Sequence, residues 1–249
     1  MFRIYIVQHP AGHCHLLAAA TKAFLGCDLA STTVPDPLNV ITLIPMDGSQ
    51  LCSAVATRFY AVNGTHPMTP EDDAYASEWY VELEALAETA GIPASELRRL
   101  MLADRLPLPS YIRSDGAQMV ARDLLELPRR AGGYEHLPEW FGQQFQSGRD
   151  AIREWDGYLR GQYVCLRDVL PETIQRKDEL VKAITAALTK PEPENDDWLE
   201  SLHRLVDELD ELEPPFTAYD RLRFRGSISR DTCINAVRAR FPRRSIPIR

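Results

Sequence analysis

The sequence lacks most of the short motifs that mark common catalytic sites. It has no glycine-rich phosphate loop and no Gly-x-Ser-x-Gly, His-Glu-x-x-His or Cys-x-x-Cys segment. Its five cysteines have no regular spacing, so they do not form a recognisable disulfide framework. After Met68 only two cysteines and two histidines remain. That part of the chain therefore contains few of the residues that a histidine-based triad or a zinc site needs.

Long apolar runs are missing as well. No stretch reaches the about 18–20 apolar residues that a membrane-spanning helix needs. Residues 1–30 do not combine a basic start, a compact apolar run and a small-residue cleavage site, which is the pattern of a secretory signal. We therefore expect a cytoplasmic protein with reduced thiols and no membrane partner.

Glutamate is absent from residues 1–67. This segment holds only six charged side chains, and at Met68 it gives way to Thr-Pro-Glu-Asp, a strong helix start. Short β-branched runs at 2–7 and 40–44 are typical of strands, and 16–25 is typical of a short helix. We predict that the fold begins near Met68. Residues 1–67 are then a poorly patterned segment that is either disordered or derived from a start codon set too early.

Charge is unevenly distributed over the rest of the chain. Residues 219–249 carry a net charge of +7, which leaves −15 on residues 68–218 because the whole chain carries −8. An acidic body disfavours general binding to nucleic acid. The acidic helix that ends near Glu213 is either a solvated face or a surface for a basic partner. We also expect that it pairs with the arginine-rich tail of the same molecule.

Helical patterns dominate after Met68. Thr69 and Pro70 begin one helix, a second covers 83–90 and ends at Gly91, and a third runs to Ala103. A hairpin follows at 109–120, because Asp115-Gly116 is the strongest turn signal in the chain. From Leu124 onward apolar residues recur every three or four positions. We predict a mainly α fold with a winged helix-turn-helix unit at 68–122, which contains the one hairpin, and a helical domain with a basic tail at 123–249.

The segment 82–120 resembles the winged helix-turn-helix of MerR regulators. Gly91-Ile92 match the turn of that family, Leu97 and Arg98 match the aliphatic and arginine positions of its second helix, and Leu106-Pro107 match its end. The resemblance implies that Arg98 contacts a phosphate. The candidate DNA-binding residues are Arg98, Arg99, Arg105 and Arg113.

Several positions depart from the MerR pattern. Pro93 replaces the usual capping residue, Ser95 replaces a basic groove contact, and Glu96 adds a negative charge where phosphates would pass. Residues 82–105 carry a net charge of −2, and duplex binding depends mainly on neutralising phosphates. The alternative is a helix-turn-helix that serves as a folding unit or a protein contact.

A second resemblance covers about residues 75–241. The segments that carry it are 106–111, 114–120, 155–163, 176–181, 214–221 and 229–231. They are similar to a bacterial family of unknown molecular function whose members are labelled natural-product biosynthesis proteins. The resemblance implies an association with biosynthetic gene clusters and transfers no catalytic residue.

Two further groups of residues are candidates for chemistry. His9, His13, Cys14 and His15 are potential metal ligands, but no second cluster completes a site, so we predict neither a metal nor a cofactor. Carboxylates beside aromatic residues form either a pocket for acid–base chemistry or a structural motif. These residues are Asp156, Tyr158, Tyr219, Asp220 and Arg221.

Three functions fit these observations. The first is a non-enzymatic accessory or regulatory protein of natural-product biosynthesis, with an unknown protein or small molecule as its partner. The second is a MerR-like DNA-binding regulator, which the acidic surface disfavours. The third is an enzyme that acts on a biosynthetic intermediate, although no set of residues names the reaction.

Overall fold

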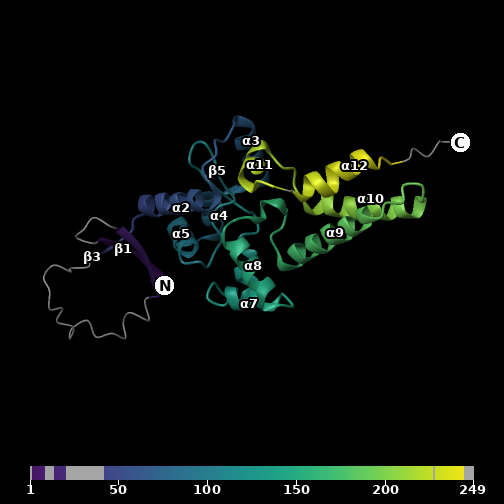
Figure 1. Cartoon of the computed structure of the whole chain (residues 1–249). Coiled ribbons are helices and arrows are strands. Elements are labelled where there is room, and N and C mark those ends of the chain that lie inside the picture. Colours follow the sequence, from purple (N-terminus) through teal and green to yellow (C-terminus); the bar gives the residue numbers. More distant parts are fainter. Residues whose placement is uncertain (1, 9–13, 21–41, 227, 244–249) are drawn as a thin grey trace.

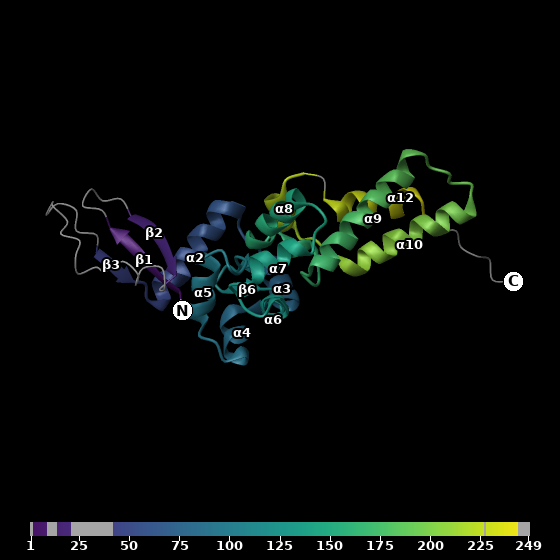
Figure 2. The ribbon, with the colours of Figure 1, turned by 90° about the horizontal axis from the view of Figure 1, so that it is seen from below.

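The computed structural model describes residues 2–8, 14–20, 42–226 and 228–243. Figures 1 and 2 show an elongated arrangement with strands β1–β3 at one end and helices α9, α10 and α12 at the other. Helices α2–α8 and α11 fill the region between these ends. The fold is mainly helical, as the sequence predicts.

The first strands form an antiparallel sheet in the order β2-β1-β3. They are β1 (Phe2–Gln8), β2 (Cys14–Ala20) and β3 (Thr42–Pro45). The β-branched runs at the start of the chain and near residue 42 thus lie in strands. The helix expected at 16–25 is wrong for residues 16–20, which belong to β2 and pair with β1. His9 and His13 of the proposed ligand cluster lie outside the described residues.

The prediction that the fold begins near Met68 is wrong, because helix α2 (Gly48–Asn63) precedes this residue and packs in the core. Asp47 caps it, because its side chain accepts from the backbone of Gln50. Leu51 and Val55 are fully buried, four residues apart on one face, and pack in the same cluster as residues of α5. Residues 48–63 are therefore part of the core. The divisions after residues 67 and 122 otherwise stay predictions.

The predicted order of helix, glycine turn, helix and hairpin is present at 83–120. Gly91 ends the first helix with φ 66°, a left-handed conformation that glycine adopts without strain. The hairpin turns at Asp115-Gly116, and a strand before the first helix joins it to give the order β4-β6-β5. The elements are α3 (Pro70–Trp79), β4 (Val81–Glu82), α4 (Leu83–Ala90), α5 (Ala94–Leu102), β5 (Tyr111–Ile112) and β6 (Gln118–Val120).

Short and long helices make up the remainder. Helices follow one another from Glu126 onward, in agreement with the helical spacing that the sequence shows after Leu124. The bounds are α6 (Glu126–Ala131), α7 (Leu137–Gln143), α8 (Gly148–Leu159), the 3-10 turn η1 (Tyr163–Cys165), α9 (Pro171–Thr189), α10 (Asp196–Leu212), α11 (Ala218–Phe224), the π-helical η2 (Arg230–Asn235) and α12 (Ala236–Arg240).

The C-terminal helices η2 and α12 pack on the pair of long helices α9 and α10. Ile234, Val237 and Phe241 are buried in one cluster with apolar residues of both long helices. The predicted pairing of the acidic helix with the arginine-rich tail is confirmed. Its ion pairs join Asp210 to Arg230 and Arg238, and Asp207 to Arg238 and Arg243.

Within the described part of the chain, no helix is both long and apolar enough to cross a bilayer.

We predict that Phe59→Ala lowers the free energy of unfolding by about 3–5 kcal/mol, because it empties a fully buried site of α2. Urea denaturation of the full chain measures this loss. Ser53→Ala is the control, since Ser53 is exposed on the same helix and its replacement should change stability by less than about 0.5 kcal/mol. Equal stability of the two variants would show that α2 does not belong to the core.

Candidate functional site

Arg98, the expected phosphate contact, is an internal residue of the segment 83–120. It is only 6% exposed. Its Nε donates to Gln118 Oε1 at 2.8 Å, and its Nη2 pairs with the carboxylate of Glu84 on α4. Gln118 is itself buried and donates to the carbonyl of Cys52 at 3.0 Å. Arg98 therefore ties α5 to α4, to the hairpin and to α2, and the prediction that it contacts a phosphate is not supported.

Other basic side chains around this unit are also held by carboxylates. Arg113 on the hairpin contacts Glu82 at 3.0 Å and Asp115 at 2.5 Å. Arg99 contacts Glu96 at 3.2 Å within α5. Arg105 is half-buried in the turn after α5.

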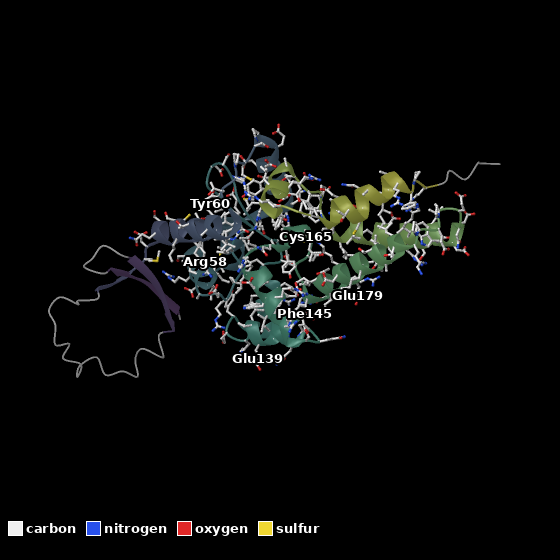
Figure 3. All side chains as sticks on the ribbon, in the orientation of Figure 1. Arg58, Tyr60, Glu139, Phe145, Cys165 and Glu179 are labelled. Carbon is white, nitrogen blue, oxygen red and sulfur yellow. The ribbon has the colours of Figure 1, made fainter. Side chains whose placement is uncertain are left out.

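Arg58 adds one more such contact from outside the predicted set. This α2 residue, labelled in Figure 3, donates to the carbonyl of Leu102 at 3.0 Å and pairs with Asp104. The basic side chains of this region therefore serve mainly to join elements to one another.

The five residues of the proposed pocket or structural motif lie in four separate places. Asp156 is exposed on α8 and pairs with Arg160 at 2.9 Å. Arg221 is exposed on α11 and pairs with Asp231 at 2.8 Å. Tyr219 and Asp220 are buried between α11 and the hairpin, and Tyr158 faces a different cavity. The structure does not bring them together as one pocket.

Asp220 has a structural role at the start of α11. Its carboxylate accepts from the backbone N–H of Thr217 at 2.9 Å, which completes a capping box, and from the Tyr111 hydroxyl at 2.7 Å. Burial raises the pKa of Asp220 above its ordinary value. The hydrogen bonds oppose this shift without cancelling it. Asp220 thus links α11 to the hairpin across a cluster of tyrosines.

Arg223, one turn further along α11, was not predicted as a site residue. It donates to Asn63 Oδ1 at 2.8 and 3.0 Å, to the carbonyl of Ser110 at 2.6 Å and to the carbonyl of Gly161 at 2.8 Å. The guanidinium carbon also lies 5.2 Å from the ring centroid of Phe59. Burial lowers the pKa of Arg223. It therefore holds α2, the start of the hairpin and the loop after α8 in one place.

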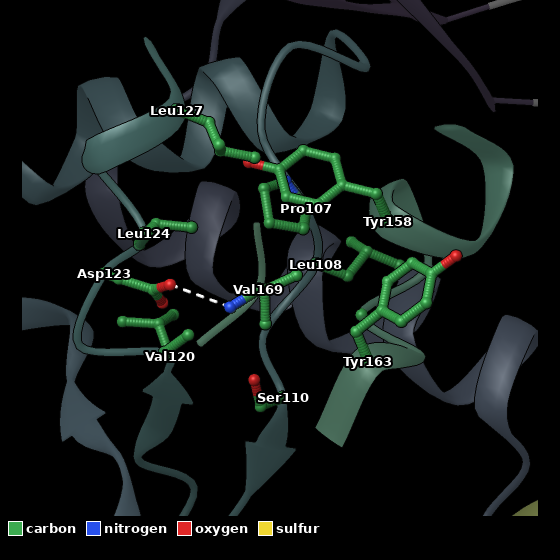
Figure 4. A pocket seen from close by; sticks show the side chains of 12 residues that line it. Pro107, Leu108, Ser110, Val120, Asp123, Leu124, Leu127, Tyr158, Tyr163 and Val169 are labelled. Carbon is green, nitrogen blue, oxygen red and sulfur yellow. Dashed lines mark hydrogen bonds between the residues drawn. The ribbon is translucent and has the colours of Figure 1, made fainter. Parts of the chain in front are cut away.

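A cavity opens beside the two carbonyl groups that Arg223 holds. Its volume is about 30 Å³, enough for about one water molecule. Figure 4 shows Tyr158 and Tyr163 on one side and Asp123 on the other. The lining residues are Pro107, Leu108, Ser110, Val120, Ala121, Asp123, Leu124, Leu127, Tyr158, Gly161, Tyr163 and Val169.

Two polar groups that line this cavity are able to form hydrogen bonds with a molecule inside it, the Tyr158 hydroxyl and the Asp123 carboxylate. The Tyr158 hydroxyl is buried and has no hydrogen-bond partner among the residues that the structure describes. Burial raises the pKa of Tyr158, so the phenol stays protonated and able to donate. Burial also raises the pKa of Asp123, whose carboxylate accepts from the backbone N–H of Val169 at 2.8 Å. The cavity can order a water between such groups but is too small for an organic substrate.

No cluster for a metal ion is found in the described residues, where no three His, Cys, Asp or Glu side chains are suitably placed.

Part of the chain matches a known protein family. Residues 134–242 match a family of unknown function, DUF6058. No curated protein matches the chain, and no solved structure does. The DUF6058 match begins before α7 and ends after α12, so it contains Gly161 and Arg223. It does not cover the segment 83–120 or Asn63, so two of the groups that Arg223 contacts, Asn63 and the carbonyl of Ser110, lie outside it.

The sequence contains partial signals for the residues that were missed. Thr217 and Asp220 have the spacing of a capping box, which predicts the start of α11. Gly161 lies between a helical pattern and an aromatic residue, which is typical of a helix end. Nothing local distinguishes Arg223 from Arg221 or Arg225, because its acceptors come from distant segments.

We predict that Gly161→Ala destabilises the protein by about 2 kcal/mol or more. Gly161 has φ +65°, and an added Cβ would lie 2.8 Å from the carbonyl oxygens of Leu108 and Pro109. Gly148→Ala is the matched control, since Gly148 begins α8 with nothing within 4 Å of an added Cβ. The control should be neutral or slightly stabilising. Chemical denaturation compares them, and equal effects would contradict the close approach at Gly161.

We predict that Asp220→Asn gains stability relative to the wild type as the pH rises from about 4 to 7. A carboxyl with a raised pKa contributes stability below its unfolded pKa and loses it as the pH passes the folded pKa. Asparagine keeps the acceptor oxygen and cannot ionise. The measurement is the difference in unfolding free energy at several pH values.

The control for this pH dependence is Asp115→Asn. The hydrogen bond from Arg113 lowers the pKa of Asp115, so its contribution is present at higher pH and lost as the pH falls. Asp115→Asn should therefore lose stability relative to the wild type mainly as the pH rises from about 2 to 4, and the difference should change little from about 4 to 7. The prediction would be refuted if the difference in unfolding free energy between Asp220→Asn and the wild type does not change with pH. It would also be refuted if Asp220→Asn loses stability relative to the wild type as the pH rises, as expected for Asp115→Asn.

Proposed function

We propose that this protein is a non-enzymatic accessory or regulatory protein associated with natural-product biosynthesis. It acts by binding a protein or small-molecule partner. Its helix-turn-helix unit serves as a folding and contact element. The association with biosynthesis is supported by the resemblance of residues 75–241 to a family with that label. The mode of action is supported by the internal pairing of Arg98.

The pairing of Arg98 is the main support for the proposal, because the central basic group of α5 is then not available to a phosphate. To contact a phosphate, the guanidinium would have to leave Glu84 and Gln118 and the interior between α4 and the hairpin. This would leave a buried amide without one of its partners. Arg113 and Arg99 have carboxylates in contact as well, so a phosphate would compete with groups already in place.

The enzyme hypothesis has weaker support. The five candidate residues are dispersed, and the cavity beside Tyr158 holds about one water molecule. A catalytic carboxyl also needs a partner within reach of a substrate. Asp123 is engaged with the backbone of Val169.

One observation favours the alternative of a MerR-like DNA-binding regulator. Helix α4, the Gly91 turn, α5 and the β5–β6 hairpin follow one another in the order of a winged helix-turn-helix. On this alternative Arg99, Arg105 and Arg113 would contact phosphates, and binding would weaken steeply with salt.

The test is enrichment of bound sequences from a pool of random duplex DNA, followed by fluorescence anisotropy of the full chain with an enriched duplex and with a scrambled one. We expect no sequence-selective binding tighter than about 1 µM at about 0.15 M salt, because the body is acidic and Arg98, Arg99 and Arg113 are paired with carboxylates. Arg113→Gln should then behave like the wild type. Submicromolar, sequence-selective binding that Arg113→Gln weakens, while the exposed control Arg149→Gln does not, would overturn the proposal in favour of the regulator.

A further inference from the structure

A second pocket lies on the other side of Asp123. It shares Ala121 and Asp123 with the cavity of Figure 4 and has a volume of about 260 Å³. Trp79, Tyr80, Leu166 and Pro214 provide aromatic and aliphatic walls. This size and lining suit a small organic molecule.

Arg122 enters this pocket directly after the hairpin. Its Nη2 donates to the carbonyl of Glu78 at 2.8 Å and its Nε to the carbonyl of Trp79 at 3.3 Å. Both carbonyls belong to the last turn of α3. These bonds fix the guanidinium and leave its Nη1 without a hydrogen bond among the described residues.

Arg167 enters the same pocket from the segment after η1. Its guanidinium carbon lies 4.5 Å from the ring centroid of Trp79, which restrains its plane. The backbone N–H of Arg167 donates to the carbonyl of Leu212 at 3.0 Å. Within the described residues, its guanidinium donates no hydrogen bond.

Neither guanidinium has a carboxylate within 4.0 Å in the part of the chain that the structure describes. This sets them apart from arginines such as Arg98, Arg113 and Arg230, which are ion-paired. Asp123 and Asp168 also line the pocket. Asp123 turns its carboxylate to the Val169 backbone. Two restrained and unpaired guanidinium groups therefore face one apolar-walled pocket.

We propose that this pocket binds a small organic carboxylate through Arg122 and Arg167, with its apolar body against Trp79 and Leu166. Planar guanidinium groups match the two oxygens of a carboxylate. Asp123 and Asp168 disfavour a more highly charged phosphate. All of its lining residues lie outside 82–120, the segment that resembles a winged helix-turn-helix, so the proposal does not depend on the function proposed above.

Isothermal titration of the full chain with benzoate tests the proposal. We expect saturable one-to-one binding, weakened at least about tenfold by Arg122→Gln and by Arg167→Gln. Arg149→Gln makes the same change of charge at an exposed position of α8 and should leave the affinity within about twofold of the wild type. Benzamide, which has the same shape without the charge, should bind at least about tenfold more weakly than benzoate.

Three outcomes would overturn the proposal. They are absence of saturable benzoate binding up to about 10 mM, equal affinity of the wild type and Arg167→Gln, and inorganic phosphate binding more tightly than benzoate. Arg167 is exposed and holds no ion pair in the described residues, so its replacement will leave the fold intact. Thermal unfolding of the variant checks this expectation. Arg167→Lys, which keeps the charge but not the planar fork, should also weaken binding.

Discussion

The central part of this fold depends on the guanidinium of Arg223. It joins α11 to Asn63 at the end of α2, to Ser110 before the hairpin and to Gly161 after α8. Every one of these acceptors is uncharged, although the body of the protein is strongly acidic. A partly buried charge among neutral acceptors depends on these hydrogen bonds, because water reaches it less easily than it reaches an exposed charge. The positions of three distant segments are thereby coupled to one side chain.

Local signals in the sequence were sufficient for many of the elements. Thr69, Gly91 and Asp115-Gly116 each act on their own neighbours, and each begins or ends an element as predicted. Helix α2 was not predicted because its segment carries little charge, although Leu51, Val55 and Phe59 have helical spacing. Low charge does not exclude a helix at the surface, since uncharged residues such as Ser53 and Thr57 occupy its exposed face.

The candidate sites were harder to predict, for a geometric reason. Arg98 has the sequence position of a phosphate contact, yet Glu84 and Gln118 reach it once α4 and the hairpin pack against α5. Arg122 and Arg167 are ordinary arginines in the sequence, and they share a pocket because Trp79 lies between their segments. The packing of helices and strands against one another decides whether an arginine has a carboxylate partner or is available to a ligand. A single sequence does not show this packing.

The bond between Asn63 and Arg223 joins residues that are 160 positions apart. Contacts of such separation form late, since a long loop must close before they contribute. During synthesis Asn63 and Ser110 are made long before Arg223 leaves the ribosome. Asn63 and the carbonyl of Ser110 therefore lack this hydrogen-bond partner until α11 has been synthesised. The order of translation thus makes the C-terminal segment the one that completes the fold.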